Sequence, residues 1–363
     1  MTQQLHRETL DEILLSQDVN NLSLDQIGQM LQKDEAISKF APDGICQVDP
    51  RNGDRIVFNS ARARRPHDNQ PTKSKAPDSG QSCVICQGKT TKVIDVEDLN
   101  EGFTFINENL FPVFYPADDD NDYPIDDGKR VANLEGIPAF GFHFLQWTSS
   151  FHDKDWHNMH QADRVIVMQR LAALEKKLLA EVNGYVSIIK NFGRLVGGSL
   201  AHGHQQIGFS NIMPRRARLD QRFEDEHREA FSRYLLRTNP PELTIRDYGA
   251  AVLLVPYFMR RPFDMFLLLK DSRKTHLFDL DEAEIAAVAD GWRDAIHIML
   301  TVMPQIGRES AYNLTTHNGP GAGLYFEFLP YTQEMGGFEH LGLFLCQGNP
   351  TDTAKYARAI LAK

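Results

Sequence analysis

The stretch NFGRLVGGSLAHGHQQ, residues 191–206, decides how this sequence can fold and what chemistry it can support. It leaves a predicted strand over 185–192, passes through a Gly-Gly-Ser turn and enters a second predicted strand over 202–210. Residues two apart on a strand face the same side, so His202, His204 and Gln206 are predicted to form a row on one face.

The composition of this row favours chemistry at phosphorus over a strand with two incidental histidines. A neutral imidazole can attack phosphorus, and a neighbouring amide can donate to a phosphoryl oxygen as charge develops. The preceding glycines let the backbone approach a ligand closely, and their N–H groups can hold phosphate oxygens. We therefore expect His204 to be a nucleophile and Gln206 its phosphoryl-contacting partner.

Outward from this stretch, the same order of elements occurs twice. Each half has two strands, a helix and two further strands, and short connections favour antiparallel pairing. The predicted fold class is therefore α+β, with an antiparallel sheet and a packed helix in each half. The helices are expected over 161–183 and 281–301, and the remaining strands over 103–110, 141–147, 251–258, 265–270, 312–317 and 324–330. The predicted boundaries are a helical extension at 1–45, a first half at 46–215 and a second half at 216–363.

Two of the four cysteines, Cys83 and Cys86, form a C-x-x-C. In a reducing compartment this spacing indicates metal binding or redox chemistry before it indicates a disulfide. It does not open a helix after a strand, which argues against a thioredoxin-type pair. Zinc takes four N or S ligands, so two more must come from elsewhere. The candidates are His202 and one further histidine, for which spacing alone leaves open His152, His143, His157 and His160.

A third segment, residues 49–66, carries a predicted turn, a short strand and a cluster of arginines that includes Arg62 and Arg65. Arginine forks suit diphosphate oxygens. The alternative for this segment is a solvated basic loop.

The chain as a whole is acidic, with a formal net charge of −10 over 363 residues. Such a field does not attract nucleic acid or an anionic membrane, so neither is an expected partner. The sequence contains no apolar stretch of membrane-spanning length, and its first residues lack the apolar core of a secretion signal. These observations predict a cytoplasmic protein.

Together, the three segments resemble the galactose-1-phosphate uridylyltransferase family, a duplicated branch of the histidine-triad superfamily. The resemblance runs from about Gln47 to the C-terminus and leaves the first 45 residues outside. The shared patterns are D-P-x-x-G with R-x-x-R-P, C-x-x-C-x-G, a histidine before the long helix, N-x-G-x-x-x-G-x-S-x-x-H-x-H-x-Q, and the V-P-Y and R-P-F of residues 255–263. Their order and spacing are more specific than any one motif.

The resemblance implies roles for individual positions. His204 would be the nucleophile and Gln206 its partner, and a structural zinc would be held by Cys83, Cys86, His152 and His202. Arg62 and Arg65 would contact the nucleotide phosphates, Asn107 and Glu108 would lie near the ribose, and Glu339 would face the hexose. The nucleotide and phosphate pocket would be lined by Asn191, Gly197 and Ser199. Family members are often homodimers, because the active site borrows residues across the interface.

The sequence also departs from the family pattern. Gly203 stands between the two histidines, where the uridylyltransferases usually have proline. The histidine pair expected near residues 323–327 for a second metal is absent. Asp220 and His317 match the other two ligand positions, and Glu327 is the candidate substitute, which makes a second metal doubtful.

The implied reaction moves a nucleoside monophosphate between a nucleotide sugar and a sugar 1-phosphate through a covalent nucleotidyl-histidine. One alternative is a phosphorylase of nucleotide sugars or dinucleoside polyphosphates, which uses inorganic phosphate as acceptor. Another is a non-catalytic nucleotide-binding protein, although pure binding does not require the imidazole of His204.

Overall fold

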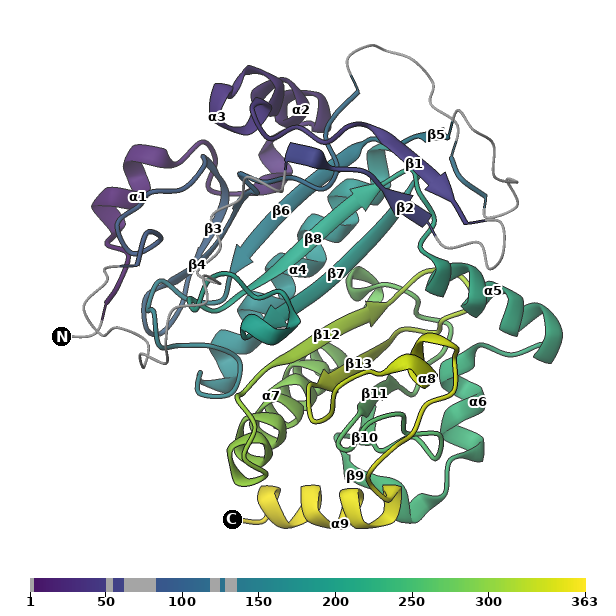
Figure 1. Ribbon diagram of the computed structural model, residues 1–363. Helices are drawn as coiled ribbons and strands as arrows, with labels where there is room; N and C mark the ends of the chain where they lie inside the picture. Colours follow the sequence, from purple (N-terminus) through teal and green to yellow (C-terminus); the bar gives the residue numbers. More distant parts are fainter. Residues whose placement is uncertain (1–2, 50–54, 62–82, 118–124, 128–135) are drawn as a thin grey trace. The chain divides into compact units, whose positions relative to one another are not determined.

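The computed structural model describes two compact units (Figure 1). The described residues are 3–49, 55–61, 83–117, 125–127 and 136–363. The first unit comprises Met1–Asp155, Gln169–Ile188 and His202–Leu219, and the second comprises Trp156–Met168, Ile189–Ala201 and Asp220–Lys363. The predicted boundaries at residues 45 and 215 stay a prediction.

The strands of the first unit form an antiparallel sheet in which the chain order is not the spatial order. Along the sheet the order is β3-β4-β6-β8-β7. The bounds are Val93–Asp98 for β3, Phe103–Glu108 for β4, Gly141–Trp147 for β6, Tyr185–Phe192 for β7 and His204–Ser210 for β8. Trp147 pairs with His204, and Leu145 pairs with Gln206, so β6 lies directly beside the strand of the central motif.

The second unit repeats this arrangement. Its strands follow the order β12-β13-β11-β10-β9, and residues 189–192 at the end of β7 pair with β12. The bounds are Thr244–Asp247 for β9, Ala251–Leu254 for β10, Met265–Leu269 for β11, Tyr312–His317 for β12 and Tyr325–Pro330 for β13. In each half the four core strands lie in the order first, second, fourth, third, which confirms the predicted duplication.

The two long helices agree with the sequence prediction. Helix α4 spans Gln161–Glu181, and α7 spans Glu282–Gln305 behind an N-cap at Asp281, whose side chain accepts from the Glu284 N–H. Such a cap satisfies backbone donors that the first turn leaves open. The apolar side chains that recur at three- and four-residue steps along both helices are buried: Val167, Leu171, Leu174, Leu178, Ile285, Val288, Trp292, Ile296 and Met299. A Cβ on Gly291 of α7 would come within 2.5 Å of the Leu267 side chain, so α7 lies close against β11.

The N-terminal extension is helical, as predicted, and is part of the first unit. It contains α1 (Arg7–Ile13), a 3-10 turn η1 (Val19–Asn21), α2 (Leu24–Lys33) and α3 (Glu35–Ser38). Leu5, Leu10 and Val19 are fully buried. The Leu15 N–H donates to the Val93 carbonyl at 2.7 Å, which ties the extension to the edge strand β3.

The remaining elements are smaller. A three-stranded sheet has the order β2-β1-β5, with β1 at Ile45–Val48, β2 at Arg55–Val57 and β5 at Ile137–Pro138. The other helices of the described residues are α5 (Arg215–His227), α6 (Phe231–Thr238), α8 (Gly337–His340) and α9 (Pro350–Leu361). Short 3-10 turns are η3 (Arg194–Val196), η4 (Pro241–Leu243) and η5 (Leu277–Asp279).

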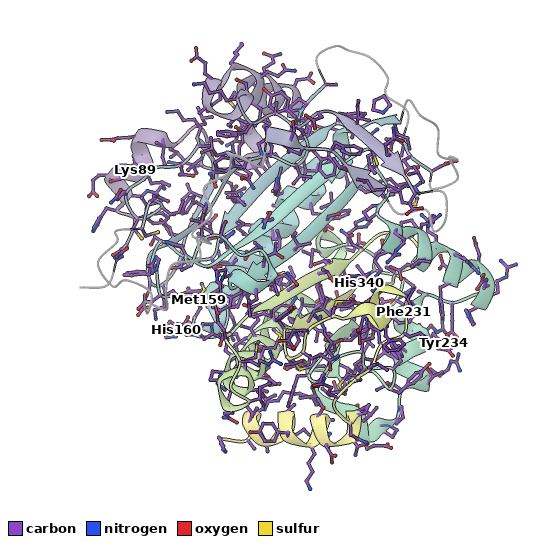
Figure 2. The ribbon with its side chains drawn as sticks, in the orientation of Figure 1. Lys89, Met159, His160, Phe231, Tyr234 and His340 are labelled. Atoms are coloured by element: carbon purple, nitrogen blue, oxygen red, sulfur yellow. The ribbon has the colours of Figure 1, made fainter. Side chains whose placement is uncertain are left out.

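Phe231 of α6, labelled in Figure 2, packs on the apolar cluster formed around Phe266 of β11 and Tyr325 of β13 in the second unit. Among the described helices, none has the length and apolar character required to cross a membrane.

Candidate active site and metal centre

His204 is the first residue of β8 and is almost fully buried. Its Nδ1 lies 2.8 Å from the backbone carbonyl oxygen of His202. A carbonyl oxygen can only accept, so Nδ1 carries the proton and Nε2 keeps its lone pair. The backbone of His202 thus holds His204 in the tautomer that a nucleophilic imidazole requires.

Gln206 is oriented by a residue that sequence reasoning did not assign to this role. The Val113 N–H donates to His143 Nδ1 at 3.0 Å, so the ring carries its proton on Nε2. That nitrogen lies 3.1 Å from Gln206 Oε1 and donates to it. With its oxygen engaged, Gln206 has its amide N–H groups to offer to an anion.

The predicted strand beginning at His202 is wrong by two residues, because β8 begins at His204. His202 belongs instead to a group of four side chains with Cys83, Cys86 and His152. Their ligand atoms all lie within 4.8 Å of one another. Cys86 Sγ is 3.6 Å from His202 Nδ1 and 3.9 Å from His152 Nδ1. These separations suit the edges of a tetrahedral metal site with two sulfur and two nitrogen ligands.

The chemistry of the group also fits a cation. His202 Nε2 donates to the Ser149 carbonyl at 2.7 Å, which directs the lone pair of Nδ1 toward the sulfurs. Burial, together with the neighbouring Cys83, raises the pKa of the Cys86 thiol to about 12. A bound cation would offset this cost, because a coordinating thiol gives up its proton. The group can therefore hold a metal ion, and it selects His152 from the four histidines that spacing left open.

Gly203 lies between His202 and His204 in the chain and packs against Asp155. A Cβ at this position would come 2.8 Å from the Asp155 Cγ, closer than real Cβ contacts. Asp155 accepts from the Thr148 hydroxyl at 3.1 Å, and the Thr148 N–H donates to the Gly203 carbonyl at 2.9 Å. The absence of a side chain at Gly203 is thus what allows Asp155 to sit here.

The two residues assigned to the ribose differ in their contacts. Asn107 donates to Thr90 and Thr91 and accepts from the Trp147 indole, so its amide is engaged within the fold. Glu108 is buried, and its Oε1 has no hydrogen-bond partner among the described residues. Burial, with a smaller contribution from Asp34, raises the pKa of Glu108 to about 8. A nearly neutral carboxyl with an open oxygen is able to bind a hydroxyl group.

Several of the predicted binding residues belong to the second unit. Asn191 accepts from the Asn313 amide at 2.7 Å. Gly197 ends η3 with a positive φ of 85°, a conformation that glycine adopts without strain. Ser199 follows in the same loop. Glu339 in α8 accepts from the Gly336 and Leu345 N–H groups, and its pKa is lowered first by its own backbone N–H and then by these two. Their roles in binding stay predictions, and Arg62 and Arg65 lie outside the described residues.

The proposed second metal ligands come together, but they form an ion-pair bridge. Asp220 Oδ2 lies 3.4 Å from His317 Nδ1, and Glu327 Oε1 lies 3.7 Å from His317 Nε2. The two carboxylates thus occupy opposite edges of one ring, whereas a metal needs its ligand atoms to converge. Tyr325 stands where one of the expected histidines would be. It stacks on His317 at 4.2 Å, and its hydroxyl donates to Asp220.

Burial alone would lower the pKa of His317, but the charges and hydrogen bonds of Glu327 and Asp220 raise it to about 9. The ring is therefore an imidazolium at neutral pH. Arg260 adds a second positive charge 3.4 Å from Glu327. The Glu327 carboxylate thus lies beside two positively charged side chains, His317 and Arg260.

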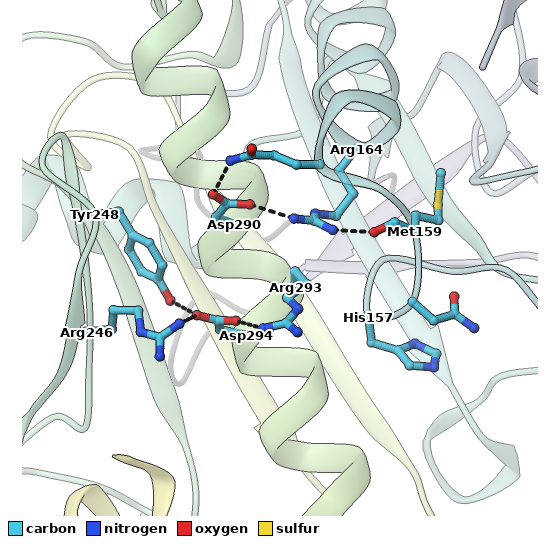
Figure 3. Close-up of a pocket in the computed structure, with 10 residues that line it drawn as sticks. His157, Met159, Arg164, Arg246, Tyr248, Asp290, Arg293 and Asp294 are labelled. Carbon is cyan, nitrogen blue, oxygen red and sulfur yellow. Dashed lines mark hydrogen bonds and ion pairs between the residues drawn. The ribbon is translucent and has the colours of Figure 1, made fainter. Parts of the chain in front are cut away.

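A polar cavity of about 540 Å³ in the second unit is lined by His157, one of the histidines that spacing left open, together with residues outside the predicted set (Figure 3). Asp294 accepts there from Arg246 and Tyr248 at 2.8 Å and also from Arg293. Arg164 is paired with Asp290 at 2.6 Å. The arginines and aspartates that line the cavity largely neutralise one another. The cavity therefore does not have the strong positive field of a diphosphate site.

Comparison with known proteins places this geometry in context. No family model matches the chain. An ADP-glucose phosphorylase from Arabidopsis thaliana is 24% identical over 337 residues, which cover 86% of this chain and 92% of that protein. A galactose-1-phosphate uridylyltransferase from Kluyveromyces lactis is 23% identical over 243 residues, or 62% of this chain and 65% of that protein.

The chain is similar in sequence to an ADP-glucose phosphorylase and to galactose-1-phosphate uridylyltransferases. The fold agrees: a solved uridylyltransferase aligns over 88% of this chain and 98% of its own, with a TM-score of 0.67 and 19% identity. The crystal structure of an ADP-glucose phosphorylase from Arabidopsis thaliana with bound ADP-glucose aligns over 86% of this chain and 98% of its own. Its TM-score is 0.60 and its sequence identity is 19%. These relatives support the predicted resemblance and the predicted fold class.

The residues that sequence reasoning missed are those that orient the others. Spacing in the sequence points to His143 only as a candidate metal ligand, and no local pattern points to Asp155. The alternation along 141–147 places His143 and Leu145 on one face of β6. The pairing of Leu145 with Gln206 across the sheet, which brings His143 within reach, is a tertiary relationship.

Proposed function

We propose that this protein transfers a nucleoside monophosphate from a nucleotide sugar to an acceptor phosphate through a covalent intermediate on His204. The observation that supports this most strongly is the 2.8 Å contact from His204 Nδ1 to the His202 carbonyl, which leaves Nε2 as the nucleophilic atom. The sequence relatives are named for enzymes of nucleotide sugars and sugar phosphates.

In the first step, the lone pair of His204 Nε2 attacks the α-phosphorus of the donor. An N–P bond forms, the bond from that phosphorus to the bridging oxygen breaks, and the electron pair leaves with the sugar 1-phosphate. In the second step, an oxygen of the acceptor phosphate attacks the same phosphorus and the N–P bond breaks, which returns the lone pair to Nε2. The leaving phosphate is already stable as an anion, so clamping of charge matters more than acid catalysis.

The surrounding residues have distinct proposed tasks. Gln206, held by His143, donates to a non-bridging oxygen of the transferred phosphoryl group. The proposal assigns Glu108 and Asn107 to the ribose, Asn191, Gly197, Ser199, Arg62 and Arg65 to the nucleotide phosphates, and Glu339 to the sugar. A zinc ion held by Cys83, Cys86, His152 and His202 would be structural. It would anchor His202, whose carbonyl orients the nucleophile.

The acceptor distinguishes two versions of this function. The uridylyltransferase type uses a sugar 1-phosphate. The phosphorylase type uses inorganic phosphate, and it is favoured by one observation: the relative that covers 86% of this chain is named an ADP-glucose phosphorylase. Both versions pass through the same nucleotidyl-histidine and differ only in the second step.

The intact mass of the protein tests the first step. The protein is mixed separately with UDP-glucose, ADP-glucose and a GDP-sugar, with no acceptor present. We expect a mass gain equal to one nucleoside monophosphate for one donor, and the size of the gain identifies the base. The adduct should be absent in His204→Ala and present in His160→Ala, an exposed histidine that serves as the control.

Adding either inorganic phosphate or a sugar 1-phosphate to the isolated adduct then identifies the acceptor, because only the true acceptor removes the nucleotide at a catalytic rate. If His204→Ala keeps full turnover, the covalent mechanism is wrong. If no donor modifies the wild type but nucleotides bind, the non-catalytic alternative is favoured.

We also propose that two copies of this chain pair, as the resemblance implies. The segment 335–345 around α8 is rich in exposed apolar side chains, with Phe338 57% exposed and Leu341 78% exposed. An exposed apolar run of this length is typical of a protein interface. Sedimentation equilibrium should give twice the chain mass, and Leu341→Glu should shift the protein toward monomer.

A further inference from the structure

The first described residues of the chain run beside the segment that carries one of the metal-site histidines. The His152 N–H donates to the Gln3 carbonyl at 2.9 Å, and the Leu5 N–H donates to the Ser150 carbonyl at 2.9 Å. Gln4 forms an antiparallel bridge with Phe151 between these two contacts. The backbone position of His152 is therefore set in part by residues 3–5.

The side chain of Gln3 reaches the other half of the metal group. Its Oε1 accepts from the backbone N–H of Cys83 at 2.8 Å. Cys83 opens the C-x-x-C turn, and its own carbonyl accepts from the Gln87 N–H at 3.1 Å. Gln3 thus accepts from one backbone N–H in each of the two segments that must converge on a metal.

The same turn is packed beneath α1. Gly88, the glycine of C-x-x-C-x-G, has a φ of +70°, and a Cβ there would come 2.3 Å from the Thr9 Cγ2. Leu5 and Leu10 of the same segment are fully buried, and a Cβ on Gly88 would also come 3.8 Å from the Leu5 Cδ1. Lys89, which follows the turn, is labelled next to α1 in Figure 2.

We propose that Gln3 is a positioning residue of the metal centre, and that residues 3–10 act as a strap that holds the C-x-x-C turn next to His152. This inference rests on the zinc site of the proposed function. Binding a metal here requires four side chains from three segments to reach one point, and ordering those segments costs conformational entropy. A strap that fixes two of the segments beforehand reduces that cost, so the metal binds more tightly. The extension therefore serves the reactive part of the protein, because His202, a member of the same metal group, orients His204.

Zinc affinity of the full-length protein, measured by competition with a chromophoric chelator, tests the strap. We expect Gln3→Ala to weaken zinc binding about tenfold, in the range seen when groups that orient metal ligands are removed. Gln3→Glu should restore most of the loss, because its carboxylate accepts the same Cys83 N–H. Gln4→Ala is the matched control, and it should bind zinc as the wild type does, since Gln4 contributes its backbone to the strap.

A second readout follows the hydrogen bond directly. Amide hydrogen exchange at Cys83 should be faster in Gln3→Ala than in Gln4→Ala. Exchange in strands β9 to β13 of the second unit should be the same in both variants. Equal zinc affinity in Gln3→Ala and the wild type overturns the strap but leaves the zinc site intact. A wild type that binds no zinc overturns both proposals, and the nucleotidyl adduct on His204 then shows whether the rest of the function stands.

Discussion

His143 Nε2 lies 3.1 Å from Gln206 Oε1, and this contact aims the amide N–H groups of Gln206 away from His143. The tautomer of His143 is set by the Val113 N–H, so the orientation begins in the backbone. The two residues that act on phosphorus in the proposed reaction, His204 and Gln206, are thus each held by a hydrogen bond to a neighbouring histidine.

Replacing His143 by Phe removes the donor that holds Gln206. We expect the kcat of nucleotidyl transfer to fall about tenfold, because a phosphoryl-contacting donor loses its fixed direction. The KM for the nucleotide sugar should change little. Steady-state kinetics of His143→Phe, Gln206→Ala and the double variant provide the check. The double variant should be no slower than Gln206→Ala, and losses that multiply would show that His143 acts elsewhere.

Replacing Gly203 by Ala forces a methyl group toward Asp155. The fold must shift to accept it, and overpacking of this kind costs about 1–3 kcal/mol of the free energy of unfolding. Urea denaturation of Gly203→Ala measures this cost. Gly208→Ala in the following strand β8 is the control, because its Cβ would make ordinary 3.7 Å contacts with Phe114 and should be tolerated. Adding Asp155→Ala should recover part of the loss, and no recovery would place the strain elsewhere.

The imidazolium of His317 predicts a definite dependence of stability on pH. Its pKa is raised from an ordinary 6.5 to about 9, so its contribution is fully present below pH 6.5 and is lost as the pH rises through 9. His317→Gln should therefore lower the free energy of unfolding by up to roughly 3 kcal/mol near pH 6, and by less at pH 9.5. Urea denaturation at both pH values measures the two differences. The exposed His160→Gln should show no such trend, and a constant difference for His317→Gln would contradict the charged ring.

Glu108 predicts a loss of stability in the same direction, but in a lower pH window than His317. Its pKa is raised to about 8, so the folded protein loses stability relative to the unfolded chain as the pH rises from 4.5 toward 8. Glu108→Gln removes this ionisation. It should increase the free energy of unfolding at pH 8 and change it little at pH 4.5, whereas the exposed Glu12→Gln should have no effect. If Glu108 binds the ribose, Glu108→Gln should also raise the KM for the nucleotide sugar at pH 8.

The sequence by itself determined the elements and the reactive motif. Strands 141–147, 185–192 and 312–317 and the buried faces of α4 and α7 follow from local periodicity, because each element buries one face of its own residues. The duplication, the H-x-H-x-Q and the C-x-x-C are likewise local patterns that can be read without a fold.

Only the tertiary structure decided which residues meet. It selected His152 among four histidines as the partner of the cysteines, placed His143 against Gln206, and put two carboxylates on opposite edges of His317. It also brought Gln3 to both halves of the metal group. These relationships join residues far apart in the chain, and they depend on strand register and on packing between elements, which local spacing does not encode.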